Sequence, residues 1–375
     1  MSQRRANSVL DALLRSSAAE TTRRIINIAQ HPPVPRRQGL AQSTAQACLV
    51  VPVYFGTDRA LRRSSDPKYR YSNERGELTF GIAEVSIPAR HKLGELEGPQ
   101  WWKARFRDDA GRHVLLLDAS QREQRAFTTE VRAALSSADE SDLLLFVHGY
   151  NTSFADAIRR TAQISYDLKF PGHALLYSWP SAEAPMAYAA DEATVEHSIP
   201  NFERFLRLVL TRIGARQLHV IAHSMGARAL ARLLKDFEWS TLPSGSATLC
   251  QIVFAAPDID AGTFRGLASN FRADGDRCTL YASRGDFPLR LSRILHRYPR
   301  AGDTGKGLLI VRGVDTVDAS QADSSLFGLG HSYFAAKRPI LSDMHNLIIK
   351  NEPPNRRFDL IPMNHADGAY WLYRA

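Results

Sequence analysis

The chain has 375 residues, 44% hydrophobic and 23% charged, so it is long enough to bury a large core as one domain or two small ones. Apolar runs of about 18 residues are missing and the first residues lack the apolar centre of a secretory signal, which argues against a membrane-spanning or exported protein and predicts a cytoplasmic location. The formal charge of +9 does not predict nucleic-acid binding, because the sequence holds no zinc-finger pattern and no interleaved aromatic and basic motif.

Residues 1–45 form a basic arm. They contain seven Arg and two acidic residues, a net charge of +5, which leaves +4 for the remaining 330 residues. An amphipathic helix is expected early in the arm, on the spacing of Val9, Leu10, Leu13, Leu14, Ile25 and Ile26. The stretch HPPVPRRQG cannot continue a helix. We expect a solvated or packed-on arm; the alternatives are peripheral docking on an anionic membrane and a targeting peptide.

The chain from Leu49 onward changes to short apolar runs separated by Gly, Pro and Asp. Three of these runs follow one another without long helices between them, which predicts an antiparallel opening region. They read LVVPVYFGTD, LTFGIAEVSIP and HVLLLDAS. Cys48, Cys250 and Cys278 lie in or beside apolar runs without metal-type spacing, so we expect unpaired core cysteines.

After Asp142 the sequence alternates between apolar strands and helices. The strand LLLFVHG precedes a helix expected over 153–168, ALLYSWPS precedes one over 191–213, and LHVIAHS precedes one over 225–235. The runs LCQIVFAAP and CTLYASR continue the series. Such alternation is typical of an α/β fold with a mostly parallel sheet covered by helices on both faces. In such sheets the chemistry lies at the carboxyl ends of the strands.

The junction between LHVIAHS and the following helix has only a few residues in which to turn. Its five residues, Ala222-His223-Ser224-Met225-Gly226, match the nucleophile elbow, small-x-Ser-x-Gly, in which small residues relieve crowding between strand and helix. Ala222 replaces the usual first Gly, and its single methyl group still allows the turn. We therefore predict Ser224 as a nucleophile; the alternative is a serine that only caps the helix.

A serine nucleophile needs a base oriented by an acid, and in this architecture the acid precedes the base in the sequence. Asp286, three residues beyond Ser283, follows the second strand after the elbow and is the expected acid. Asp258, together with Asp260, follows the first strand and is the alternative. Asp258 could instead cap the next helix.

Several histidines follow the elbow. His331 lies in the Gly-flanked stretch SLFGLGHSYF, which has no helical or strand period, and is the expected base. His296 and His345 fall in predicted helices and are expected to be surface or packing residues, and His365 is a further downstream candidate. His223 is adjacent to the serine and points elsewhere, which argues against it.

Acyl transfer also needs donors for the developing oxyanion, and backbone N–H groups at fixed positions are the usual solution. Met225 begins the helix after the serine and supplies one N–H. The loop FVHGYNTSF supplies the second through Tyr150, with Gly149 allowing close approach and His148 and Asn151 supporting the loop. The alternative is that this His-Gly turn simply ends a strand.

With these residues identified, the sequence resembles a bacterial α/β-hydrolase family of unknown function, domain of unknown function 900, which is similar in pattern to serine esterases and lipases. The resemblance runs from about Val51 to Leu347. It rests on VYFGTDR, GIAEVSIPARHKLGELE, FVHGYNTSFADAIRRTAQ, YSWPS, IAHSMGARAL, AAPDID, YASRGD and GHSY. The resemblance places Ser224, Asp286 and His331 in the triad, in agreement with the residues singled out above.

Other site types are not expected. The acidic stretch DTVDASQADS lacks the spacing and Gly of a calcium loop, and no GxxxxGK[ST] phosphate cradle occurs, so we expect neither a metal nor a nucleotide. Trp101, Trp102 and Trp179 are expected to serve packing, with the lining of an acyl pocket as the alternative.

The sequence therefore predicts a catalytic domain over 46–350, with the arm before it and a C-terminal tail over 351–375. The expected reaction is cofactor-free hydrolysis of a small-molecule or lipid carboxylic ester through an acyl-enzyme. Two alternatives remain: a lipase or phospholipase that docks on a membrane through the arm, and an inactive hydrolase fold used as a binding module.

Overall fold

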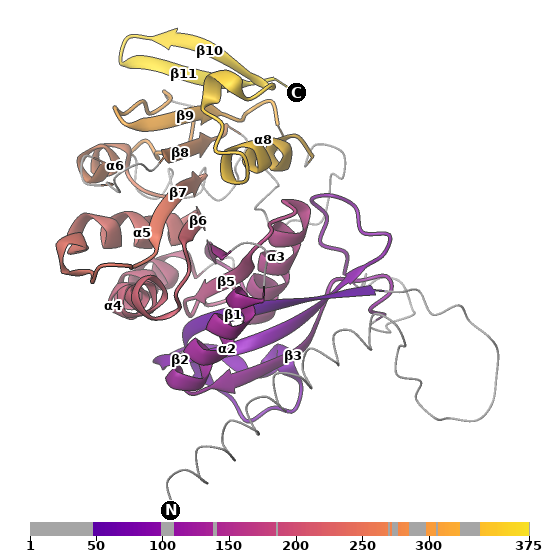
Figure 1. Ribbon diagram of the computed structural model, residues 1–375. Helices are drawn as coiled ribbons and strands as arrows, with labels where there is room; N and C mark the ends of the chain where they lie inside the picture. Colours follow the sequence, from indigo (N-terminus) through magenta and orange to yellow (C-terminus); the bar gives the residue numbers. More distant parts are fainter. Residues whose placement is uncertain are drawn as a thin grey trace, which may run out of the picture.

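The computed structural model describes residues 48–98, 109–137, 141–184, 187–268, 271, 277–284, 298–304, 307–322 and 338–374. Within these ranges, eleven strands form one sheet in the order β10-β11-β9-β8-β7-β6-β4-β5-β1-β2-β3 (Figure 1). The strands are β1 (Cys48–Leu61), β2 (Tyr71–Pro88), β3 (Leu115–Arg122), β4 (Asp142–Val147), β5 (His173–Ser178), β6 (Gln217–His223), β7 (Thr248–Ala255), β8 (Arg277–Ala282), β9 (Val314–Asp318), β10 (Leu360–His365) and β11 (Gly368–Tyr373).

The middle of the sheet is parallel and its N-terminal edge is antiparallel. β1 pairs antiparallel with β2, and β2 pairs antiparallel with β3. From β1 through β5, β4, β6, β7, β8 and β9, every neighbouring pair is parallel. Both predictions of strand direction are therefore confirmed. Because the parallel strands run the same way, the segments after β4, β5, β6, β7 and β8 all leave the sheet at one edge.

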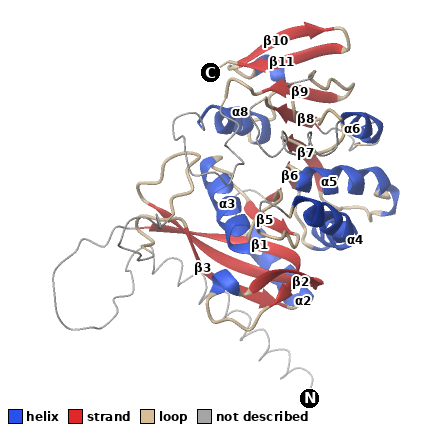
Figure 2. Ribbon diagram, turned by 180° about the vertical axis from the view of Figure 1, so that it is seen from behind, coloured by secondary structure: helices blue, strands red, loops and turns tan. Residues whose placement is uncertain are grey.

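Six α-helices of the described residues cover the two faces of the sheet. They are α2 (Gln124–Ser136), α3 (Phe154–Asp167), α4 (Tyr188–Arg212), α5 (Met225–Asp236), α6 (Ala261–Ala268) and α8 (Arg338–Ile348). Helices α3 and α8 lie on one side of the sheet and α4, α5 and α6 on the other (Figures 1 and 2). The helix expected over 191–213 begins slightly earlier, at Tyr188.

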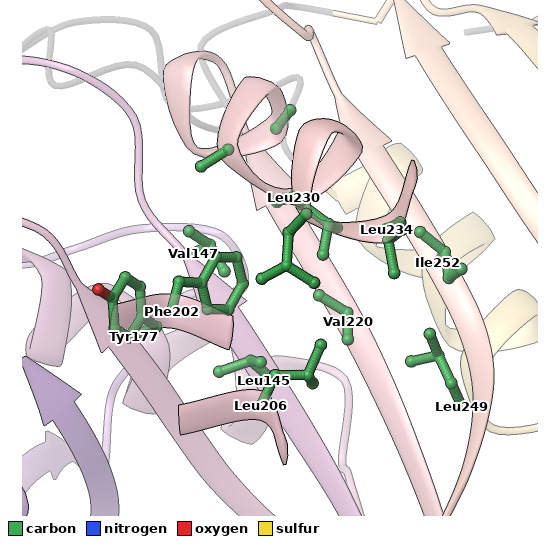
Figure 3. Close-up of a cluster of buried hydrophobic side chains, with 14 of the residues drawn as sticks. Leu145, Val147, Tyr177, Phe202, Leu206, Val220, Leu230, Leu234, Leu249 and Ile252 are labelled. Carbon is green, nitrogen blue, oxygen red and sulfur yellow. The ribbon is translucent and has the colours of Figure 1, made fainter. Parts of the chain in front are cut away.

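The alternation of side chains along the central strands explains why both faces are covered. Leu145 and Val147 of β4 belong to the core cluster that holds α4 and α5 (Figure 3), whereas Leu144 and Phe146 belong to the cluster that holds α3 and α8. Successive strand residues point to opposite faces, so a strand that is apolar at every position must be buried on both.

The stretch expected as a C-terminal tail extends the sheet. β10 and β11 form an antiparallel hairpin, and β11 pairs with β9 through Trp371 and Leu372. The sequence does not predict this hairpin, because β10 is mostly exposed and its apolar and polar residues alternate too little to indicate a strand. None of the three cysteines, all of which lie in the described part of the chain, forms a disulfide; Cys278 is buried, whereas Cys48 and Cys250 are partly exposed. Among the residues that the structure describes, no helix has both the length and the apolar character needed to cross a membrane.

Candidate active site

Ser224 is the single residue between β6 and α5. Its backbone has φ 52° and ψ −118°, a region that L-residues rarely occupy. This conformation costs about 1–3 kcal/mol and persists only where the surroundings enforce it. Two hydrogen bonds to the end of β7 enforce it here. The Ser224 N–H donates to the carbonyl of Ala255 at 3.1 Å, and its carbonyl accepts from the N–H of Asp258 at 3.2 Å. The serine therefore occupies a strained turn at the carboxyl edge of the sheet, as the elbow motif predicts.

Two glycines allow the segment after β4 to lie directly against this turn. A Cβ on Gly149 would stand 3.0 Å from the Ser224 Cβ and 2.7 Å from His223 Nδ1. A Cβ on Gly226 would stand 2.3 Å from the carbonyl oxygen of His148. Both distances are shorter than a carbon side chain tolerates, so both positions need glycine for steric reasons.

Ser224 itself is 3% exposed. Within the described part of the chain its hydroxyl has no hydrogen-bond partner. A buried hydroxyl without a partner loses free energy, and such groups in folded proteins need an explanation. The N–H of Met225 lies beside it in the first turn of α5, where a helix leaves its N–H groups without intrahelical acceptors.

The loop after β4 is fixed from two directions. The Arg59 guanidinium, which is fully buried, donates from Nη2 to the carbonyl of Thr152 at 2.6 Å. From the other side, the buried carboxylate of Asp191 accepts from the N–H of Asn151 at 3.1 Å and from the hydroxyl of Ser181 at 2.6 Å. Asn151 has φ 51°, so these bonds also hold a left-handed residue in place.

Sequence reasoning missed both anchors. Arg59 closes the motif VYFGTDR, which we used only as part of a family resemblance, and Asp191 was placed at the start of a helix without a role. A usable signal existed for Arg59: it stands near the end of a long, mostly apolar strand pattern, and a charge in such a strand is rarely buried unless it has partners.

Asp258, the alternative acid, is fully buried and already engaged. The Tyr188 hydroxyl donates to its Oδ2, and Arg300 Nε lies 3.3 Å from its Oδ1. The helix cap proposed for Asp258 is supplied by Asp260, whose Oδ1 accepts from the N–H of Thr263 at 2.8 Å. Asp258 therefore has a structural role that ties α4 to the segment behind the elbow.

Asp286 and His331 lie outside the described residues, as do Trp101, Trp102 and His296. In the sequence Asp286 follows β8 and His331 follows β9, two strands that are parallel to β6. The ends of these strands are joined by a hydrogen bond from the N–H of Ala319 to the carbonyl of Ala282 at 2.8 Å.

The remaining candidates are located away from the serine or are buried in packing. His345 lies in α8, where its Nδ1 is 2.8 Å from the carbonyl of Leu168, and His365 is exposed at the end of β10. Trp179 is fully buried, stacks on the His148 imidazole with ring centroids 5.1 Å apart, and donates from its indole N–H to the His148 carbonyl at 2.9 Å.

Comparison with known proteins gives a family and distant structural likenesses. The family model described as "Alpha/beta hydrolase of unknown function (DUF900)" matches residues 123–350. No curated protein matches the chain by sequence. Among solved structures, the "putative cell surface hydrolase" of Lactobacillus plantarum WCFS1 is 8% identical, with a TM-score of 0.33, over 59% of this chain and 96% of that one. At this TM-score the likeness carries no argument about the present site.

Proposed function

This chain belongs to the DUF900 family of alpha/beta hydrolases, and from that membership we propose that it cleaves a carboxylic ester through an acyl-enzyme formed on Ser224. Membership supports a hydrolase; the ester substrate and the covalent route are our proposal. The observation that carries it is the strained turn at Ser224, which leaves no room for a Cβ at Gly149 and stands at the start of α5.

A strained serine at this position suits nucleophilic attack better than helix capping. The Ser224 side chain makes no cap hydrogen bond to α5, although it stands at the N-cap position. A capping serine normally bonds the N–H of the second or third helical residue. The left-handed backbone would therefore be maintained at a cost without giving the helix its usual benefit, which is expected when the hydroxyl serves chemistry.

In the proposed reaction the Ser224 hydroxyl attacks the ester carbonyl while His331 takes its proton. Asp286 would orient the imidazole and stabilise its charged form. The amides of Met225 and Tyr150 would donate to the tetrahedral oxyanion. The protonated base then gives its proton to the leaving alcohol. In the second half of the reaction a water molecule attacks the acyl carbonyl while the base takes its proton, and the base returns a proton to the Ser224 oxygen as the acid leaves.

The experiment that tests this proposal is labelling of the full chain with a fluorophosphonate probe, followed by peptide mass spectrometry. We expect an adduct on the Ser224 peptide of the wild type, none in Ser224→Ala, and a wild-type adduct in Ser165→Ala, a buried serine of α3 used as the matched control. Ser224→Ala should also lower ester turnover by several orders of magnitude without unfolding the protein.

Two outcomes would overturn the proposal. An adduct on a different serine would mean that the nucleophile is elsewhere. A folded wild type without any adduct would favour the binding module, in which the hydrolase fold is retained without turnover.

A further inference from the structure

A line of three buried polar side chains leads from β1 to the loop that carries Tyr150. Arg59 Nε donates to Ser178 Oγ at 2.9 Å, Ser178 Oγ is 3.1 Å from His148 Nε2, and His148 Nδ1 is 2.8 Å from the carbonyl oxygen of Gly149. All three residues are at most 1% exposed. Residues from β1, β5 and the end of β4 are thus linked in series.

The direction of each bond follows from the chemistry of the donors. A guanidinium can only donate, so Ser178 Oγ accepts from Arg59 and keeps its single hydrogen for another partner. That hydrogen can go to His148 Nε2 only if Nε2 is unprotonated. A neutral imidazole then carries its hydrogen on Nδ1 and donates it to the Gly149 carbonyl.

The surroundings keep His148 in this neutral form. Burial, reinforced by the charge of Arg59, lowers the pKa of His148 to about 3. Burial also lowers the pKa of Arg59, to about 10, which leaves the guanidinium charged at neutral pH. Stacking of the imidazole on Trp179 with an interplanar angle of 14° fixes the ring plane.

The last bond acts on the peptide group that contains the proposed oxyanion donor. The Gly149 carbonyl and the Tyr150 N–H belong to one planar trans peptide, so they point in opposite directions. A donor that holds the carbonyl oxygen therefore also sets the direction of the N–H. A hydrogen bond accepted by the carbonyl further polarises the same peptide, which makes its N–H a better donor.

We propose that Arg59, Ser178 and His148 form a positioning relay that aims and polarises the Tyr150 N–H toward the oxyanion. The relay rests on the proposed function, because only a reaction with a developing oxyanion uses that N–H. None of the three side chains touches the reacting atoms, so they are positioning residues rather than catalytic ones.

Ser178→Ala is the sharpest test, since it removes one hydroxyl from the middle of the relay. The matched control is Thr57→Val. Thr57 is also fully buried and lies opposite Ser178 in the β1–β5 register. Its hydroxyl donates to the Ser178 carbonyl at 2.6 Å and accepts from the Arg59 backbone N–H at 3.2 Å, so its substitution removes backbone hydrogen bonds of two relay residues while the side-chain bonds of the relay stay in place.

Two readouts separate positioning from general damage to the fold. With a soluble ester, Ser178→Ala should lower kcat by about tenfold or more with KM within about twofold, and Thr57→Val should leave both unchanged. With selective ¹⁵N labelling of the 12 tyrosines, the Tyr150 amide resonance, assigned through Tyr150→Phe, should move in Ser178→Ala and stay in place in Thr57→Val.

The outcomes distinguish the relay from the proposed function. A wild type that labels on Ser224, with wild-type kcat and an unmoved Tyr150 resonance in Ser178→Ala, overturns the relay alone. A wild type without a Ser224 adduct overturns the proposed function, and the Tyr150 resonance still decides whether the relay positions that peptide. If Ser178→Ala fails to fold, Ser178→Cys replaces it, because a thiol nearly keeps the side-chain volume but is a weak donor and a weak acceptor.

Discussion

The loop that precedes helix α3 and the segment that contacts its carboxyl end each carry a buried imidazole, and the two imidazoles differ in their charge state. His148 lies in the loop before the amino end of α3, where burial and the Arg59 charge lower its pKa to about 3. His91 contacts the carboxyl end. Burial opposes its charge, but hydrogen bonds to Asp167 at 2.9 Å and Glu97 at 2.8 Å outweigh burial and raise its pKa to about 9.

The two histidines differ in their partners: two carboxylates outweigh the effect of burial on the pKa of His91, whereas at His148 the Arg59 cation adds to the effect of burial. The carboxyl end of α3 also favours the charged form of His91, since it carries partial negative charge and His91 contacts Asp167, the last residue of the helix. A neutral imidazole can accept on one nitrogen and donate on the other, as the relay requires. A charged one donates from both, which lets His91 join the carboxylates of Glu97 and Asp167 and so fasten the segment after β2 to α3.

The first prediction concerns Gly149 in the loop that precedes α3 and has the largest expected effect. Gly149→Ala places a methyl group 3.0 Å from the Ser224 Cβ and 2.7 Å from His223 Nδ1, so the loop must move away from the serine. We expect kcat to fall by about 1000-fold, comparable to the loss of an oxyanion donor. The measurement is ester turnover by protein whose fold is verified by circular dichroism.

Gly266→Ala in α6 is the control for this substitution, because its Cβ would meet no atom within 4 Å. It should leave kcat unchanged and slightly raise stability. A Gly149→Ala enzyme within tenfold of wild type would show that the loop need not approach Ser224.

The second prediction concerns His91 at the carboxyl end of α3, where a substitution should change stability rather than rate. His91→Ala leaves the buried Asp167 and the Glu97 carboxylate without their shared cation, and we expect a loss of about 3 kcal/mol in the free energy of unfolding. Urea unfolding near pH 6 measures it. Lys92→Ala, whose side chain is 69% exposed, should change stability by less than about 0.5 kcal/mol. A large fall in kcat in folded His91→Ala would contradict this prediction, because it would show that His91 affects the rate as well as the stability.

The third prediction is the pH dependence of that stabilisation. The pKa of His91 rises from its ordinary 6.5 to about 9 on folding, so the folded state binds the proton more tightly. The contribution is therefore complete below pH 6.5 and is lost as the pH rises through 9, amounting to about 3 kcal/mol. The difference in unfolding free energy between wild type and His91→Gln should shrink across this window. A difference that grows with pH would contradict a charged His91.

The smallest effect is expected from His148→Asn. The amide of asparagine can still donate to the Gly149 carbonyl, although it no longer reaches Ser178 as the imidazole does. We expect kcat to fall by about tenfold in His148→Asn, as in Ser178→Ala, and by more in His148→Ala. Equal losses in both variants would mean that the ring stack on Trp179, and not the hydrogen bond, maintains the loop.

Much of the fold and part of the site could be predicted from the sequence, because they depend on local patterns. Continuous apolar strands alternating with helices predict a parallel sheet covered on both faces, and that sheet is present. The elbow around Ser224 and the His-Gly loop are short motifs whose glycines report close approach of backbone segments, and neither Gly149 nor Gly226 has room for a side chain. Asp286 and His331 stay predictions.

The partners that hold the site depended on the tertiary structure. Arg59 and Ser178 are 119 positions apart and meet only because β1 pairs with β5 in the register that sets Thr57 opposite Ser178. The engagement of Asp258 by Tyr188 and Arg300 likewise joins distant segments. By itself the sequence determined which backbone conformations were possible near Ser224, because the steric limits on a backbone come from residues adjacent in the sequence. Strand register decided which buried polar groups found each other, because hydrogen bonds require contact that no local pattern specifies.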